Sequence, residues 1–121
     1  MNQRIRVLRA QIKAIKRELA ALEVLRPGSL SRQFNVCGSP GCRCKASPPQ
    51  KHGPYYHLSY TRNGQGGTRS IPKGNVSAIR AALANYVRLR SLVDRWIDLA
   101  TELSDLELEL RGPGRKAPKR A

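Results

Sequence analysis

Residues 37–60 read CGSPGCRCKASPPQKHGPYYHLSY, and this stretch decides how the middle of the chain folds. It holds all three cysteines of the sequence, in the pattern Cys37-x4-Cys42-x-Cys44, and both histidines, His52 and His57. Glycine and proline between the first two cysteines let the backbone turn tightly enough to direct two thiolates at one point. Three cysteines and one histidine make a closed tetrahedral shell for Zn²⁺. We therefore expect a zinc site at Cys37, Cys42, Cys44 and His52.

The fourth ligand has two candidates. His52 is favoured because it directly precedes Gly53 and Pro54, where a loop can turn back, whereas His57 falls inside an expected strand. Free buried thiols, or a redox or disulfide role, are the alternatives to a metal. An odd number of cysteines argues against a secreted disulfide framework, and a bond between Cys42 and Cys44 would be strained. Bound zinc also supplies folding free energy to a segment with few apolar residues.

Strand-forming segments lie on both sides of the cysteines. Residues 55–62 are rich in β-formers, and residues 68–71 can return as their partner strand. Residues 63–67 (NGQGG) are a turn signal, but they are too long for a two-residue loop, so the turn type stays open. Upstream, residues 30–36 can form a short strand that leads to the cysteines. We expect a β-hairpin module over residues 30–73.

Helical periodicity flanks this module on both sides. The N-terminal run predicts a helix over residues 1–26, stopped by Pro27-Gly28, because its apolar residues alternate in spacings of three and four. The C-terminal run has the same spacing and predicts a helix over residues 75–111, with Asn75 as N-cap. The first seam consists of Ile5, Leu8, Ile12, Ile15, Leu19 and Leu22, and the second of Leu89, Leu92, Trp96, Leu99, Leu103, Leu106 and Leu110.

Two such seams are most simply buried against each other in an antiparallel, coiled-coil-like hairpin. The predicted fold class is therefore α+β: two long helices flanking a small zinc-stapled β-hairpin module. We expect one domain over residues 1–111, followed by a disordered basic tail over residues 112–121. The acidic second half of the C-terminal helix would face the basic N-terminal helix. Because the second seam is longer, part of it is available for a homodimer or a protein partner.

The charge is the first indication of function. The sequence has 23 Lys and Arg against 8 Asp and Glu, a net charge of +15, and no carboxylate between Val24 and Val93. Such a field attracts a polyanion, of which nucleic acid is the commonest. A merely solvated surface and an anionic membrane are the alternatives. No apolar run is long enough to span a membrane, and no secretory signal is expected. We expect a cytoplasmic protein, associated with the nucleoid if it binds DNA.

Catalysis is not expected. No carboxylate lies near the cysteines to act as a general acid or base, and no phosphate-binding loop occurs. We therefore expect no enzyme activity and no small-molecule substrate. The favoured function is nucleic-acid binding, with DNA preferred over RNA, and the alternative is a coiled-coil adaptor that recruits a protein partner. The candidate contact residues are Arg43, Lys45, Lys51, Tyr55, Arg62, Arg69, Lys73, Arg115, Lys116, Lys119 and Arg120. Tyr56 and Tyr60 either stack on bases or pack under the helices.

The central motifs resemble a small uncharacterised prokaryotic family, a domain of unknown function. In that family a cysteine-rich turn precedes a His-Gly-Pro-Tyr strand, a return strand and a long helix. Residues 30–73 resemble it closely, and the C-terminal helix resembles it loosely. The sequence departs from the pattern at residues 65–67, which replace a single basic residue, and at His57, where an aromatic residue is more usual. The resemblance implies a fold but no activity, and the second departure strengthens His52 as the ligand.

Overall fold

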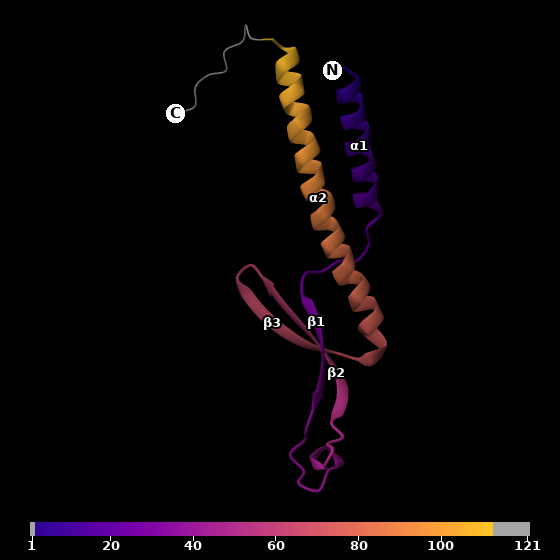
Figure 1. Ribbon diagram of the computed structural model, residues 1–121, viewed down its shortest axis with the longest axis vertical. Coiled ribbons are helices and arrows are strands. Elements are labelled where there is room, and N and C mark those ends of the chain that lie inside the picture. Colours follow the sequence, from indigo (N-terminus) through magenta and orange to yellow (C-terminus); the bar gives the residue numbers. More distant parts are fainter. Residues whose placement is uncertain (1, 113–121) are drawn as a thin grey trace. The chain divides into compact units, whose positions relative to one another are not determined.

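The computed structural model describes residues 2–112 and shows two compact units (Figure 1). Among the described residues, a helical unit combines those up to Leu22 with those from Arg88 to Gly112, and a sheet unit comprises Glu23–Val87. The elements are α1 (Asn2–Ala21), β1 (Ser29–Asn35), the short 3-10 helix η1 (Arg43–Lys45), β2 (His52–Arg62), β3 (Gln65–Ile71), the 3-10 helix η2 (Lys73–Asn75) and α2 (Val76–Leu110). This confirms the predicted α+β class.

In the helical unit, α1 lies antiparallel to the C-terminal part of α2 (Figure 1). The predicted seam of α1 is buried at Ile5, Leu8, Ile12 and Ile15. Ion pairs join the two helices at separations of 2.6–2.7 Å: Arg4–Glu102, Arg9–Glu107 and Arg88–Glu18. The basic α1 therefore faces acids of α2 as expected, although exposed pairs of this kind add little stability. Within residues 2–112, no helix is apolar over enough length to cross a membrane.

The first helix is shorter than predicted. It ends at Ala21 and does not continue to residue 26. The segment that follows belongs to the sheet unit, where it bonds to the first turns of α2: the Arg26 N–H donates to the Ala82 carbonyl at 3.2 Å, and the Asn85 amide donates to the Val24 carbonyl at 2.9 Å. These tertiary hydrogen bonds replace the helical ones before Pro27 is reached.

The three strands form one antiparallel sheet in the order β1-β2-β3. The segment predicted as a lead-in strand is thus a full member of the sheet, with Leu30 opposite Leu58. The turn between β2 and β3 is also shorter than its sequence suggested, because Arg62 already pairs with Gln65. Asn63 and Gly64 alone make the turn, with φ of 54° and 77°. Positive φ at both central residues is the hairpin geometry that Asn-Gly favours.

The core of the sheet unit lies between one face of the sheet and the first turns of α2. Leu58, Ile71 and Val76 are buried, and Tyr56 and Tyr60 pack against them. Because side chains alternate along a strand, Tyr56, Leu58 and Tyr60 share this covered face and the residues between them point to the other.

Candidate metal centre

The sheet itself positions two of the four expected ligands. Asn35, the last residue of β1, pairs with His52, the first residue of β2, after a bulge at Gln33–Asn35. Cys37 follows two residues beyond Asn35. The register of the ladder therefore brings Cys37 and His52 to the same end of the sheet, although fourteen residues of chain separate them.

A short turn supplies the other two cysteines. Cys42 precedes η1 and Cys44 lies within it. The Cys42 N–H donates to the Ser39 carbonyl at 3.2 Å, and the Lys45 N–H donates to the Cys42 carbonyl at 2.9 Å. The Lys45 ammonium also donates to the Cys37 carbonyl at 2.6 Å. These bonds fold the loop back on itself, so that both thiols meet the residues at the sheet end.

All four ligand atoms lie within 4.8 Å of one another. The sulfurs of Cys37 and Cys44 are 3.6 Å apart, and the sulfur of Cys42 lies 3.1 Å from Nε2 of His52. A tetrahedral Zn²⁺ with Zn–S of about 2.3 Å places two sulfurs about 3.8 Å apart, and a sulfur and a histidine nitrogen about 3.6 Å apart. The arrangement thus fits one metal ion after movements of about 1 Å or less. It does not fit a disulfide, and all three cysteines are free thiols.

The loop that carries the cysteines has no apolar core of its own. Every residue from Val36 to Lys51 is exposed except Cys37, Cys42 and Cys44, and Cys44 is only 1% exposed. A loop of this length with no buried apolar side chain lacks the usual means of holding one conformation. Besides a few hydrogen bonds within the loop, the cluster is the one place among the described residues of the loop where side chains are buried together, and a metal bound there would act as a structural one.

The thiols differ in acidity. A hydrogen bond from the backbone of Ser39, followed by bonds with His52, Cys42 and Cys44, lowers the pKa of Cys37 to about 6. For Cys44, the backbone N–H of Cys37 acts to lower the pKa, but burial and the neighbouring thiols outweigh it and raise the pKa. Thiolates are the form that binds metal. A metal at this site would displace the remaining thiol protons.

His57 does not join the cluster. It lies within β2, opposite Ser31 of β1 and Ser70 of β3. The group that the structure brings together is Cys37, Cys42, Cys44 and His52.

The residues expected to contact nucleic acid are all in the sheet unit or the tail. The seven from Arg43 to Lys73 are exposed, and Tyr55 is 46% exposed. Tyr56 and Tyr60 instead pack against the core, each with an arginine over its ring: Arg80 at 5.9 Å and Arg26 at 5.0 Å. Arg115, Lys116, Lys119 and Arg120, with the rest of the predicted tail beyond Gly112, lie outside the described residues.

The sequence reasoning missed the uncovered face of the sheet, which we call the open face. Its side chains are polar and uncharged at almost every position: Ser29, Ser31, Gln33, Tyr55, His57, Ser59, Thr61, Gly66, Thr68 and Ser70. In the sequence, hydroxyl residues alternate with larger ones along the strands. That these hydroxyl residues form one uncovered face could not be inferred before the pairing of β1 with β2 was known.

Residues 5–81 match the model of a family described as a domain of unknown function (DUF6788). The match spans most of α1, the whole sheet, the cysteine cluster and the first turns of α2, and it confirms the predicted resemblance. The chain belongs to this family. No curated protein and no solved structure shows significant similarity to it.

Proposed function

We propose that this DUF6788 protein binds nucleic acid through its sheet unit, and that one Zn²⁺ holds the loop between β1 and β2 in shape. Cys37, Cys42, Cys44 and His52 would complete the coordination of the ion. Four protein ligands leave no open position for substrate, which is typical of structural zinc sites and not of catalytic ones. The metal's contribution would be folding free energy for a loop that has no apolar core.

The observation that carries the proposal is the division of charge between the two units. The sheet unit has a single carboxylate, Glu23, against nine basic side chains: Arg26, Arg32, Arg43, Lys45, Lys51, Arg62, Arg69, Lys73 and Arg80. In the helical unit, by contrast, arginines of α1 and α2 are engaged by Glu18, Glu102 and Glu107. The positive potential is therefore concentrated where intramolecular carboxylates cannot offset it, and such a surface attracts phosphate groups.

A second candidate function is a protein adaptor, and exposed apolar side chains of the helical unit favour it. Ile97 and Leu108 of α2 are 56% and 59% exposed, on a helix whose seam already packs on α1. Apolar side chains left outside a two-helix hairpin can serve a partner helix or a second copy of the chain.

Binding of the zinc-loaded protein to a short mixed-sequence DNA duplex, measured by fluorescence anisotropy at several salt concentrations, tests the proposal. Four to six phosphate contacts would give a slope of log affinity on log salt of about −4 to −5. Replacing Arg62 and Arg69 by Ala should weaken binding and flatten the slope by up to about two contacts. The matched control replaces two exposed arginines of the helical unit, Arg17 and Arg95, by Ala, which removes the same amount of charge. This control should change the binding affinity and the salt slope little. No binding at low salt by folded, zinc-loaded protein would refute the proposal and favour the adaptor.

A further inference from the structure

The cations of the strands all lie on one face of the sheet. Each strand carries one arginine and no lysine: Arg32 on β1, Arg62 on β2 and Arg69 on β3. Arg32 lies opposite Tyr56. Arg69 lies opposite Leu58, and Arg62 follows Leu58 at an even spacing on β2. Because side chains alternate along a strand, all three arginines belong to the covered face, on the side of the sheet that packs against α2.

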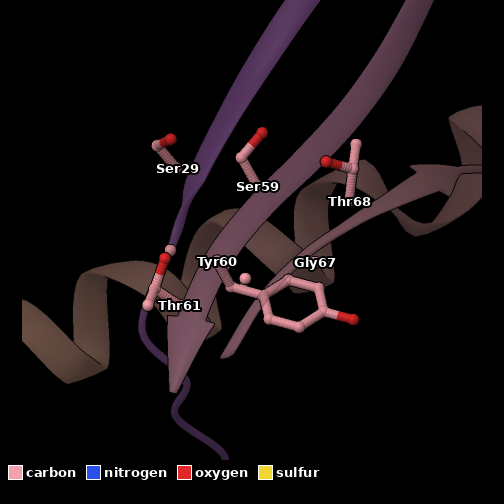
Figure 2. A pocket seen from close by; sticks show the side chains of 8 residues that line it. Ser29, Ser59, Tyr60, Thr61, Gly67 and Thr68 are labelled. Carbon is pink, nitrogen blue, oxygen red and sulfur yellow. The ribbon is translucent and has the colours of Figure 1, made fainter. Parts of the chain in front are cut away.

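This distribution is the reverse of the usual one. In antiparallel sheets with one packed face, polar and charged side chains normally occupy the solvated face. Here the open face has no lysine, arginine or carboxylate. Figure 2 shows three of its hydroxyl side chains, Ser29, Ser59 and Thr68, on one side of the sheet, and the ring of Tyr60 beside Gly67. Like charges gathered on one side repel one another, so the stability of the chain alone does not account for this arrangement.

Two further arginines lie on the covered face, each over a tyrosine ring of β2. The guanidinium carbon of Arg26 lies 5.0 Å from the ring centre of Tyr60. That of Arg80 lies 5.9 Å from the ring centre of Tyr56. At these distances the face of an aromatic ring attracts a cation. Both tyrosines pack against the core of the sheet unit, so the two arginines join the three strand arginines on the same side of the sheet.

The five arginines are not neutralised by acids of the described chain. No ion pair within residues 2–112 involves any of them. Arg26 is half-buried, and the other four are exposed. The Nε atom of Arg26 is buried without a hydrogen-bond partner among the described residues, so the ring of Tyr60 is the group that holds this guanidinium. Guanidinium N–H groups form a planar fork that matches the oxygens of a phosphate.

The spread of these cations indicates the kind of anion that they fit. Tyr56 and Tyr60 are four residues apart on β2, so the two rings under the arginines are about 13 Å apart along the strand. Arg32 and Arg69 lie on the two edge strands, about 10 Å apart across the sheet. A single small anion spans neither distance. The phosphates of one nucleic-acid strand follow one another about every 3.4 Å along the helix axis, so about four of them cover the longer distance.

The covered face offers little for the recognition of bases. The rings of Tyr56 and Tyr60 pack against the core and have an arginine over them, so they are not available for stacking on bases. Contacts to phosphates fix the position of a protein on nucleic acid but carry no sequence information.

From these observations we infer that the phosphate backbone of a nucleic acid lies along the arginine-bearing side of the sheet, and that the open face takes no part in binding. The contact residues are Arg26, Arg32, Arg62, Arg69 and Arg80. This inference rests on the proposed nucleic-acid binding and names its surface and its mode, which is contact to phosphates without recognition of bases.

Two glutamines on opposite faces of the sheet provide a matched test. Gln65 lies on the covered face, opposite Arg62, and Gln33 lies on the open face, opposite Tyr55. Both are exposed, and glutamate has nearly the same size, so both variants should fold and keep their zinc. On a short mixed-sequence DNA duplex we expect Gln65→Glu to lose about fivefold or more in affinity, the equivalent of a like charge about 4 Å away in water. Gln33→Glu should lose about twofold or less, because the sheet separates it from the phosphates.

Removal of cations gives an independent measurement. The double variant Arg32→Gln/Arg80→Gln should lose up to about two phosphate contacts and flatten the slope of log affinity on log salt by up to about 1.8. Between about 50 and 200 mM salt, the parent should therefore lose up to about twelvefold more affinity than the variant. The control Arg17→Gln/Arg95→Gln removes the same charge from the helical unit and should leave the slope unchanged.

The outcomes separate this inference from the proposed function. If Gln33→Glu weakens binding as much as Gln65→Glu, or if the first double arginine variant keeps the parent's salt slope, the covered face is not the contact surface, although nucleic-acid binding stands. If two duplexes of unrelated sequence differ by more than about tenfold in affinity, bases are recognised and contact to phosphates alone is wrong. If vesicles of anionic lipid bind the parent more tightly than the duplex does at equal phosphate concentration, the surface serves a membrane instead. If folded, zinc-loaded parent binds no duplex at low salt, the proposed function fails as well.

Discussion

Substituting Gly53 by alanine should weaken zinc binding, although Gly53 is not itself one of the expected ligands. Gly53 follows the ligand His52 and has φ of 137°, a conformation that side chains rarely adopt. A Cβ at this position would lie 2.7 Å from the Gln33 carbonyl oxygen and 3.2 Å from the Cα of Phe34. These are backbone atoms of β1, so no side chain can swing away. The strands must separate where the ladder holds His52 opposite Asn35.

The expected loss of stability combines two effects, the unfavourable φ of a non-glycine residue and the steric overlap of its Cβ with β1. A non-glycine residue held in such a backbone region costs about 1–3 kcal/mol, and overpacking costs about 1–3 kcal/mol more. We therefore expect Gly53→Ala to lower the free energy of unfolding of the sheet unit by about 2–6 kcal/mol. If the strain is relieved by displacing His52, zinc affinity falls by at least about 30-fold, the equivalent of the lower figure.

Gly28 provides a closely matched control. Its φ is 135°, and a Cβ there would also lie 2.7 Å from a strand carbonyl oxygen, that of Ser59. Ser59 is seven residues along β2 from His52, or about 23 Å of strand. Gly28→Ala should therefore destabilise the sheet unit comparably but leave zinc affinity within about threefold, less than 1 kcal/mol.

Urea unfolding with zinc bound gives the stabilities, and competition with a colorimetric chelator under native conditions gives the affinities. Equal losses of zinc affinity in the two variants would mean that metal binding follows global stability and not the local register at His52. Unchanged stability in both would refute the packing argument itself.

Three further outcomes are expected. Leu58→Ala, at a fully buried position in the core of the sheet unit, should cost about 2–5 kcal/mol in urea unfolding, and a smaller loss would mean that the sheet and the start of α2 collapse around the cavity. Removal of zinc by a chelator should increase proteolysis between Val36 and Lys51 while the helical circular dichroism of α1 and α2 persists, and loss of both together would show that the metal supports the whole chain. The hydrogen bond from Arg4 lowers the pKa of Glu102 below its usual value of 4.5, so this pair stabilises the helical unit above that pH and the contribution disappears as pH falls through the lower pKa of the folded state. Thermal unfolding from pH 7 into the acid range should show this loss in the parent and a shallower one in Arg4→Gln.

Local features of the sequence determined a large part of this molecule. The spacing of Ile5, Leu8, Ile12 and Ile15 predicted a buried helix face, and each of these side chains is buried. Helical periodicity can be recognised in a sequence because residues that are neighbours on a helix surface are only three or four residues apart in the chain. Three thiols and a histidine within sixteen residues likewise predicted a cluster, and the structure brings those four side chains together.

The tertiary structure decided what depends on distant partners. α1 ends at Ala21, and the Arg26 N–H, which a longer helix would direct to the Leu22 carbonyl, bonds instead to Ala82, fifty-six residues away. Residues 65–67 join β3 because they pair with β2, although their own glycines favour a loop. Position 67 requires a glycine because the ring of Tyr60 occupies the space where a side chain would lie. The open face depends on the same fact: which strand residues meet solvent is set by which strands pair, and pairing is a property of the sheet and not of any one segment.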